Sequence, residues 1–131
     1  STINPIIFRY ADAYLSLAEA LYLKNGSTAA DKEKARSLIN TIRSRAGLAE
    51  LPASAIDAQN KFVECLLKER SHEFWCENGQ YRADLIRFDK FVSHAEAVKG
   101  TSYANKNKEL YPLPLSAITD GKGLVLNNPG Y

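Results

Sequence analysis

An apolar stripe that contains two charged residues is the feature that most constrains how this chain can fold. On a helix of about 3.6 residues per turn, one face carries Phe62, Val63, Leu66, Leu67 and Phe74. Arg70 and Glu73 fall within the same face. A charge that points into a core costs free energy unless it is paired. The sequence therefore predicts a helix whose core face carries compensated charge, required either by the fold or by a site.

Glu69 and Glu73 lie one helical turn apart, and two interpretations of the pair are open. They could act as a general acid and base, or a cation could bridge them. Carboxylates at positions i and i+4 repel each other mildly, so a bridging cation, from Arg70 or from Arg82 on the next helix, is favoured. Asp84 lies at the edge of the apolar face of that next helix. The predicted structural ion-pair network is Glu69, Arg70, Glu73, Arg82 and Asp84.

Metal, cofactor and nucleophile chemistry find little support in the sequence. Glu69 and His72 have the i, i+3 spacing of carboxylate-bridged two-metal bundles, but such a site needs a second copy. His94 is preceded at i−3 by Phe91, so that copy is missing. The serines lack a convincing base, and the glycines are scattered through turns rather than gathered in a phosphate-binding loop. We therefore assign no catalytic residue, metal ligand or cofactor.

Composition and cysteine spacing argue against nucleic-acid binding, a membrane-spanning segment and an internal disulfide. The 131 residues are 45% apolar and 24% charged, and a net charge of only +2 without a basic block gives no case for nucleic acid. Apolar stretches are interrupted well before a length that spans a bilayer, and no signal peptide is recognised at the start. If Cys65 and Cys76 share one helix, about 16 Å of axis separates them, which excludes a disulfide between them.

Capping residues and apolar periodicity predict four helices, at about 5–24, 29–46, 55–77 and 81–98. Asn4 with Pro5, Thr28 or Ser27, and Ser54 with Asp57 are the expected N-terminal caps. Asn25-Gly26, Gly47 and Asn78-Gly79 are the expected stops. Short connections predict antiparallel helical hairpins, and the first pair resembles a tetratricopeptide repeat.

Proline and glycine change the character of the chain after Gly100. Pro112, Pro114 and Gly121 to Gly130 forbid a long helix, so we expect an ordered extended tail over 101–131. This tail is expected to lie over the helices and so to bury five of its own residues: Tyr111, Leu113, Leu115, Ile118 and Leu124. The predicted fold class is all-α, with residues 1–131 as one region of helical hairpins followed by a Pro/Gly-rich tail.

Three aromatic residues could have a role in binding. Trp75 lies opposite the core face of its helix and contacts either the tail or a partner, with packing favoured. Tyr103 and Tyr111 could stack on sugar rings, although tyrosines in such a tail more often hold it in place. The residues that bind ligand therefore stay unassigned.

Four segments in order resemble the SusD/RagB family of outer-membrane lipoproteins. They are Arg9-Tyr10-Ala11-Asp12 with Ala18-Glu19-Ala20; Ala35 to Leu48, ending in Arg45-Ala46-Gly47-Leu48; Glu69-Arg70, Glu73-Phe74, Gly79, Arg82 and Asp84-Leu85-Ile86-Arg87; and Tyr111-Pro112-Leu113-Pro114 with Asn127-Asn128-Pro129-Gly130-Tyr131. The departures are small: Asn78 and Phe88 stand where the family usually has Glu and Trp.

The resemblance implies more than the spacing does. Members of the family are longer than this chain and are held on the surface of Bacteroidetes cells by a lipidated N-terminal cysteine, which lies outside this sequence. They cover a TonB-dependent, SusC-like outer-membrane transporter and capture glycans, or peptides in some members, for import. The chain corresponds to the C-terminal part, a scaffold, and no ligand contact is carried over to it.

Three functions are weighed. The first is a non-catalytic nutrient-binding lipoprotein, of which this chain is the C-terminal scaffold. A free-standing helical-repeat module for protein–protein interaction is the alternative, and the Pro-rich tail, which would fill its groove, counts against it. A helical hydrolase that uses Glu69 or Glu73 is the third.

Overall fold

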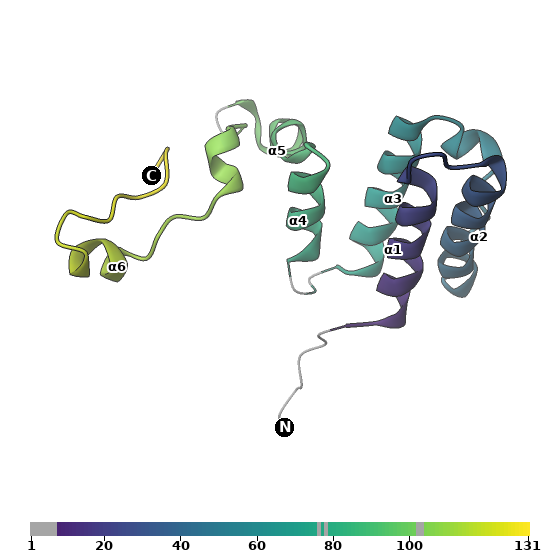
Figure 1. Cartoon of the computed structure of the whole chain (residues 1–131), viewed down its shortest axis with the longest axis horizontal. Helices are drawn as coiled ribbons and strands as arrows, with labels where there is room; N and C mark the ends of the chain where they lie inside the picture. The colour runs from purple at the N-terminus through teal and green to yellow at the C-terminus, as the bar shows by residue number, and fades with distance from the viewer. Residues whose placement is uncertain (1–7, 76, 78, 102–103) are drawn as a thin grey trace, which may run out of the picture. The chain divides into compact units, whose positions relative to one another are not determined.

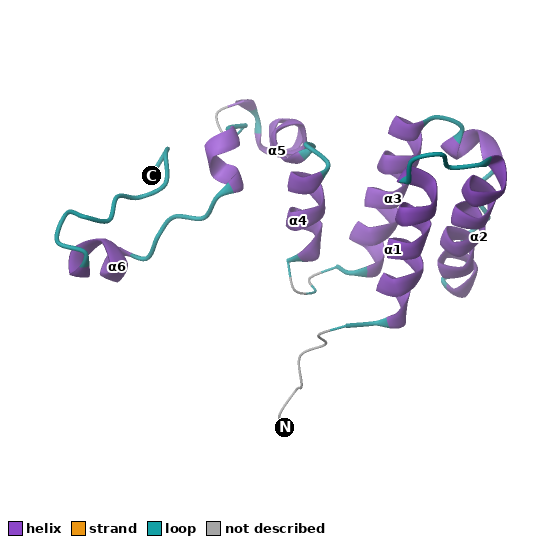
Figure 2. Cartoon of the chain, viewed as in Figure 1, coloured by secondary structure: helices purple, strands orange, loops and turns teal. Residues whose placement is uncertain are grey.

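The computed structural model describes residues 8–75, 77, 79–101 and 104–131. These residues form helices and loops without a β-strand, which confirms the all-α prediction (Figure 2). Within this described part, no helix combines the length and the apolar character that crossing a membrane requires. The chain divides into two compact units, residues 1–81 and 82–131, each considered by itself.

The first unit contains three long helices, α1 (Tyr10–Leu23), α2 (Ala29–Arg45) and α3 (Gln59–Glu73), and a 3-10 turn, η1 (Ala53–Ile56). Helix α1 packs against both α2 and α3 (Figure 1). Pairs of fully buried side chains come from α1, α2 and α3 in turn: Leu15 and Ala18, Ala35 and Ile39, Phe62 and Leu66. The three helices thus share one close-packed core in this unit.

Two polar contacts connect this core to the loop that follows α2. Tyr22 stacks on Phe62 with ring centroids 3.8 Å apart, and its hydroxyl donates to the carbonyl oxygen of Ile56 at 2.6 Å. The buried amide of Asn40 accepts from the backbone N–H of Leu51 at 2.8 Å. Because buried polar groups need partners, these contacts determine the path of the loop over the three helices.

Local signals locate the ends of α2 as predicted. Thr28 and Asp31 form a capping box, in which the Thr28 hydroxyl accepts from the backbone N–H of Asp31 and the Asp31 carboxylate accepts from that of Thr28. At the other end, Gly47 has a positive φ of 73°. Leu48 and Gly47 donate backward to the carbonyl oxygens of Arg43 and Ser44. This Schellman pattern requires a left-handed residue, which glycine supplies without strain.

The starts of the first and third helices differ from the sequence prediction. Asn4 and Pro5 lie outside the described residues, but Phe8 and Arg9 are described and are not helical, so α1 begins only at Tyr10. The predicted cap at Ser54 and Asp57 instead contributes to the 3-10 turn η1 and its C-terminal flank. Helix α3 begins at Gln59, after Ala58 in extended conformation, and ends at Glu73 rather than 77.

The predicted fourth helix is two helices, α4 (Gln80–Arg87) and α5 (Phe91–Lys99). Asp89 between them has a positive φ of 55°. Lys90 and Asp89 donate to the carbonyl oxygens of Leu85 and Ile86, which is again a Schellman pattern. Aspartate tolerates the left-handed conformation better than most residues, so the break occurs without glycine.

The segment predicted as an extended tail contains two short helices, η3 (Lys106–Glu109) and α6 (Leu115–Asp120). The burial expected there is not found for Tyr111, Leu115 or Leu124, all of which are exposed, and Leu113 and Ile118 are half-buried. The described part of residues 82–131 buries only Asp84 and Leu85. Short helices separated by proline and glycine do not form a closed core here.

Candidate functional site

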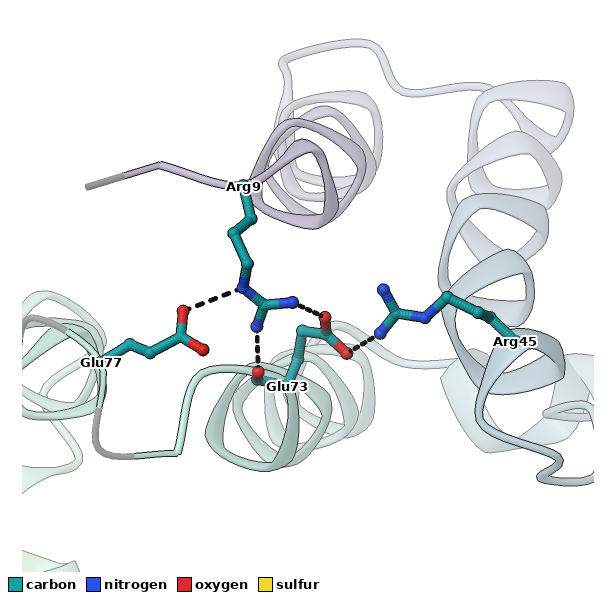
Figure 3. A network of polar contacts seen from close by, with 4 residues as sticks. All are labelled: Arg9, Arg45, Glu73 and Glu77. Atoms are coloured by element: carbon teal, nitrogen blue, oxygen red, sulfur yellow. Dashed lines mark hydrogen bonds and ion pairs between the residues drawn. The ribbon is translucent and has the colours of Figure 1, made fainter. Parts of the chain in front are cut away.

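A cluster of ion pairs at the C-terminal end of α3 contains the charged residues that the sequence singles out in the first unit. Figure 3 shows its centre, where Glu73 lies between Arg9 and Arg45 and where Glu77 lies on the far side of Arg9. Arg9 precedes α1 and Arg45 is the last residue of α2. One carboxylate therefore joins the ends of three helices.

Arg9 uses all three guanidinium nitrogens in this cluster. Its Nε donates to Glu77 Oε2 at 2.9 Å, its Nη1 donates to Glu73 Oε1 at 2.5 Å, and its Nη2 donates to the backbone carbonyl oxygen of Glu73. The hydrogen bond to Glu77 raises the pKa of Arg9 above its ordinary value. The planar, always charged guanidinium can hold two carboxylates and a helix C-terminus at once, which a lysine could not do.

Both carboxylate oxygens of Glu73 have an arginine partner. Oε1 accepts from Arg9 and Oε2 accepts from Nη2 of Arg45 at 2.5 Å, and the side chain is only 8% exposed. Burial by itself would raise the pKa of Glu73, but the hydrogen bonds from Arg45 and Arg9 outweigh it and lower the pKa below 4.5. The carboxylate is thus held in its ionised form.

The two neighbouring charges of α3 are paired in the same way with other helices. Arg43 of α2 donates to the buried Glu69, and its Nε also donates to the carbonyl oxygen of Ala49 at 2.8 Å. Arg70 donates to Asp12 of α1 at 2.8 Å. Each of these charges on the core face of α3 therefore meets an opposite charge from α1 or α2.

Phe74 links the cluster to the apolar core. Its ring is buried, and the guanidinium groups of Arg9 and Arg70 lie over it at 5.0 and 5.3 Å from the ring centroid. Cations over an aromatic face are attracted by its negative quadrupole. The ring thus covers the apolar parts of both arginines and helps to hold their polar ends on the carboxylates.

Arg82 and Asp84, the other two residues of the predicted network, lie in the second unit. Arg82 Nη2 donates to the carbonyl oxygens of Lys108 and Glu109, and its guanidinium lies over the rings of Phe91 and Tyr111 at 4.6 and 4.3 Å. Asp84 is buried and accepts from Arg87 at 2.9 Å. A five-residue network that joins the third and fourth predicted helices stays a prediction.

The other chemical candidates are dispersed. Glu69 is buried against Arg43, whereas His72 is exposed. Among the residues described, no three His, Cys, Asp or Glu side chains come together in a way that could hold a metal ion. Cys65 is a half-buried free thiol whose pKa is raised by burial. Trp75 is 75% exposed. Cys76, Asn78 and Tyr103 lie outside the described residues.

The arrangement favours a structural role for the carboxylates over acid–base chemistry. A general acid at neutral pH needs a raised pKa, whereas the pKa of Glu73 is lowered and both of its oxygens are occupied by arginines. Glu69 is likewise buried against a guanidinium. Proton transfer by Glu73 would require breaking one of these ion pairs first.

Five partners in the cluster were not assigned by sequence reasoning: Arg9, Asp12, Arg43, Arg45 and Glu77. Most of them lie in the segments that carry the family resemblance, but a sequence motif does not show which residues form ion pairs with each other. Glu73 lies 64 positions from Arg9 and 28 from Arg45. Only tertiary packing brings such distant residues together.

Comparison with known proteins gives two matches and one negative result. The model of the SusD family matches residues 1–131. The starch-binding protein SusD of Bacteroides thetaiotaomicron is 31% identical over 132 aligned residues, which cover 95% of this chain and 21% of that protein. The chain thus spans about a fifth of the length of this relative. No solved structure matches the chain.

Proposed function

The chain belongs to the SusD family, and on that premise we propose that it is the scaffold part of a non-catalytic glycan-binding protein for nutrient uptake. The family match over residues 1–131 is the observation that carries this proposal. The similarity to a protein named for starch binding makes a glycan the first ligand class to test. Because the chain spans about a fifth of that relative, the ligand contacts are assigned to parts of the protein outside these 131 residues.

The assembly that we propose follows from the family resemblance. The protein works at the outer surface of the outer membrane, held by a lipidated N-terminal cysteine outside this chain. Its partner is a SusC-like, TonB-dependent transporter that imports the captured glycan, or a peptide. The 131 residues correspond to the C-terminal portion of such a protein.

The ion pairs of the first unit support a scaffold role. Glu69, Arg70 and Glu73 each hold a different residue of α1, α2 or their flanks. We include Arg82 and Asp84 in the same network. Their carboxylates and guanidinium groups act by fixing helices, and no substrate chemistry is assigned to them.

The helical-hairpin architecture is also part of the proposal. Helices α1 and α2 form a tetratricopeptide-like hairpin, which is supported by the contact between them and by the fully buried Ala18 and Ala35, one on each helix. The Pro/Gly-rich segment 101–131 is the C-terminal tail of this architecture.

A free-standing interaction module is the second candidate. A cavity of about 260 Å³ on α1 and α2 supports it, because Tyr10, Tyr14 and Leu17 line that cavity together with Lys34 and Leu38. Such an apolar surface could accept a peptide. This candidate requires the 131 residues to bind a peptide without any further part of the protein.

The gene context and a binding measurement test the proposed function together. A lipoprotein signal upstream and a neighbouring transporter gene are expected in the genome. In calorimetry, the complete protein should bind a glycan, with starch oligosaccharides tested first, and chromatography should show no shortening of the sugar. Absence of both genomic features, or cleavage of the glycan, would contradict the proposal. Peptide capture by the 131 residues alone would favour the second candidate.

A further inference from the structure

A basic cavity in the second unit has no role in the proposed scaffold. Its volume is about 440 Å³, and its walls come from α4, α5 and η3. Arg82, Lys99 and Lys108 supply three cations to the lining, and none of the described residues that line the cavity is Asp or Glu. Residues 82–131 contain seven Lys and Arg against five Asp and Glu. Three of those seven cations and none of the five carboxylates line the cavity, which favours a negatively charged ligand.

The position of Arg82 is fixed before any ligand arrives. Its Nη2 donates to two backbone carbonyl oxygens, and its guanidinium lies over the rings of Phe91 and Tyr111. Its Nε and Nη1 make no hydrogen bond to the described part of the chain. Because these donors are held in place, a ligand that accepts from them pays little ordering entropy.

Lys108 supplies a second fixed cation. Its Nζ donates to the carbonyl oxygen of Gly130 at 2.9 Å and lies 3.7 Å from the centroid of the Tyr131 ring. An ammonium has three donors, so this hydrogen bond leaves further donors for a ligand. The two C-terminal residues thus hold the lysine that lines the cavity.

The cavity also has an apolar part of its lining. Phe91, Ala95 and Val98 line it from one face of α5, at the helical spacing i, i+4 and i+7, and His94 of the same helix lines it too. A ligand that fits this lining carries an apolar or amphipathic body as well as its charge.

We propose that this cavity binds a carboxylate carried on a six-membered ring. In a glycan this chemistry is that of a uronic acid sugar; for that source the inference rests on the proposed function and adds one contact within this chain to the ligand contacts assigned outside it. An alicyclic carboxylate is the non-sugar source of the same chemistry. The carboxylate accepts from Arg82 and Lys108, and the ring packs against Phe91, Ala95 and Val98.

A ligand titration followed by NMR tests the proposal on the complete protein. Glucuronate and glucose are a matched pair, because they differ only in a carboxylate or a hydroxymethyl group at one carbon. Glucuronate should shift the amide signals of 91–99 with a dissociation constant of about 1 mM, as expected for so small a ligand. Glucose should leave these signals unchanged. Equal binding of glucose, or equally tight binding of acetate, would overturn the proposal.

Three variants separate the cavity from a diffuse electrostatic effect. Lys108→Gln should weaken glucuronate binding about tenfold, because it removes a charged hydrogen bond. Lys106→Gln removes the same charge two residues away on η3, outside the lining, and should leave the affinity unchanged. Ala95→Phe fills the cavity without changing its charge and should abolish binding. Equal weakening by Lys106→Gln, or unaltered binding in Ala95→Phe, would contradict the proposal.

Two further arms identify the source of the ligand and separate this inference from the proposed function. Cyclohexanecarboxylate binding that equals or exceeds glucuronate binding supports the ring carboxylate and assigns a non-sugar source. Starch-oligosaccharide binding by the complete protein without glucuronate binding overturns the cavity proposal and leaves the glycan function standing. If the complete protein binds glucuronate but no glycan, the cavity proposal stands and the proposed glycan function is contradicted.

Discussion

Glu73 illustrates how a buried charge is accommodated in this chain. Its carboxylate is 8% exposed and accepts from Arg9 on one oxygen and from Arg45 on the other. Removing one partner of a buried pair is costly because the other charge stays without compensation. Here the side chain of Arg45 is 58% exposed, so water can still reach that partner. Removing the charge of Glu73 should therefore cost a moderate rather than a large part of the free energy of unfolding.

Glu73→Gln should lower the free energy of unfolding by roughly 1–3 kcal/mol, the range for a buried hydrogen bond to a charged group. Urea denaturation of the wild type and the variant measures this difference. Glu64→Gln, an exposed position on the same helix, is the matched control and should change stability by less than about 0.5 kcal/mol. Equal stability of the two variants would contradict the structural role of Glu73.

The lowered pKa of Glu73 also makes part of the stability dependent on pH. The folded pKa lies below 4.5, so in acid the unfolded state takes up a proton at this site before the folded state does. The stabilisation by Glu73 is therefore complete above about pH 4.5 and is lost as the pH falls through the folded pKa.

Unfolding measured from pH 6 down to pH 3 should show this loss. The stability difference between the wild type and Glu73→Gln should be constant near neutral pH and shrink below about pH 4.5. The variant is its own control, since the other acidic residues titrate in both proteins. A difference that grows on acidification would mean that the pKa of Glu73 is raised in the folded state.

Among the helices, α2 has the strongest local signals at its ends. The capping box of Thr28 and Asp31 satisfies free N–H groups at its start, and Lys24 adds an ion pair to Asp31 at 2.7 Å. Hydrogen bonding from Lys24, and then from Thr28, lowers the pKa of Asp31 to about 2. The box therefore persists in mild acid, and α2 has a defined first turn.

Thr28→Ala should destabilise the protein by about 1 kcal/mol, the usual cost of losing an N-terminal cap. Thermal or urea unfolding measures the loss. Thr41→Ala, in the exposed middle of the same helix, provides the control and should be neutral or slightly stabilising, since alanine has the higher helix propensity. If both variants lose the same free energy of unfolding, the loss comes from removing a threonine side chain at any position, and the hydrogen bonds of the cap add no stability.

The two units of the chain differ in how much they bury. Helices α1, α2 and α3 share a core with fully buried residues, whereas the described part of 82–131 buries only Asp84 and Leu85. Opening of a structural element costs less when few apolar contacts are lost. The first unit should therefore be the more protected part of the chain.

Hydrogen exchange on the intact chain tests this difference. Backbone amides in the middle of α1, α2 and α3 should exchange at least tenfold more slowly than those of α5 and α6, because their opening exposes the core. Exchange rates resolved for each helix by mass spectrometry or NMR give the comparison within one sample. Equal protection of α3 and α6 would show that residues 82–131 have a core as stable as that of the first unit.

The sequence by itself determined the helical class, a cap at Thr28 or Ser27, the turn at Gly47 and the presence of charge on the core face of α3; the structure has the cap at Thr28. These features depend on residues within one or two helical turns, where spacing and backbone preference act directly. The same reasoning placed one helix over 81–98, because a left-handed Asp89 gives a weaker signal than glycine. It also placed a cap at Ser54, where the chain forms a 3-10 turn.

Only the tertiary structure decided which charges meet. Sequence reasoning assigned Arg70 or Arg82 to the carboxylates of α3, whereas Glu73 is held by Arg9 and Arg45 and Glu69 by Arg43. These partners lie 26 to 64 positions away from the carboxylates they meet. Several arginines could satisfy a buried carboxylate equally well, so the pairing follows from how α1 and α2 pack on α3. Local pattern determines that a charge needs a partner, and helix packing determines which partner reaches it.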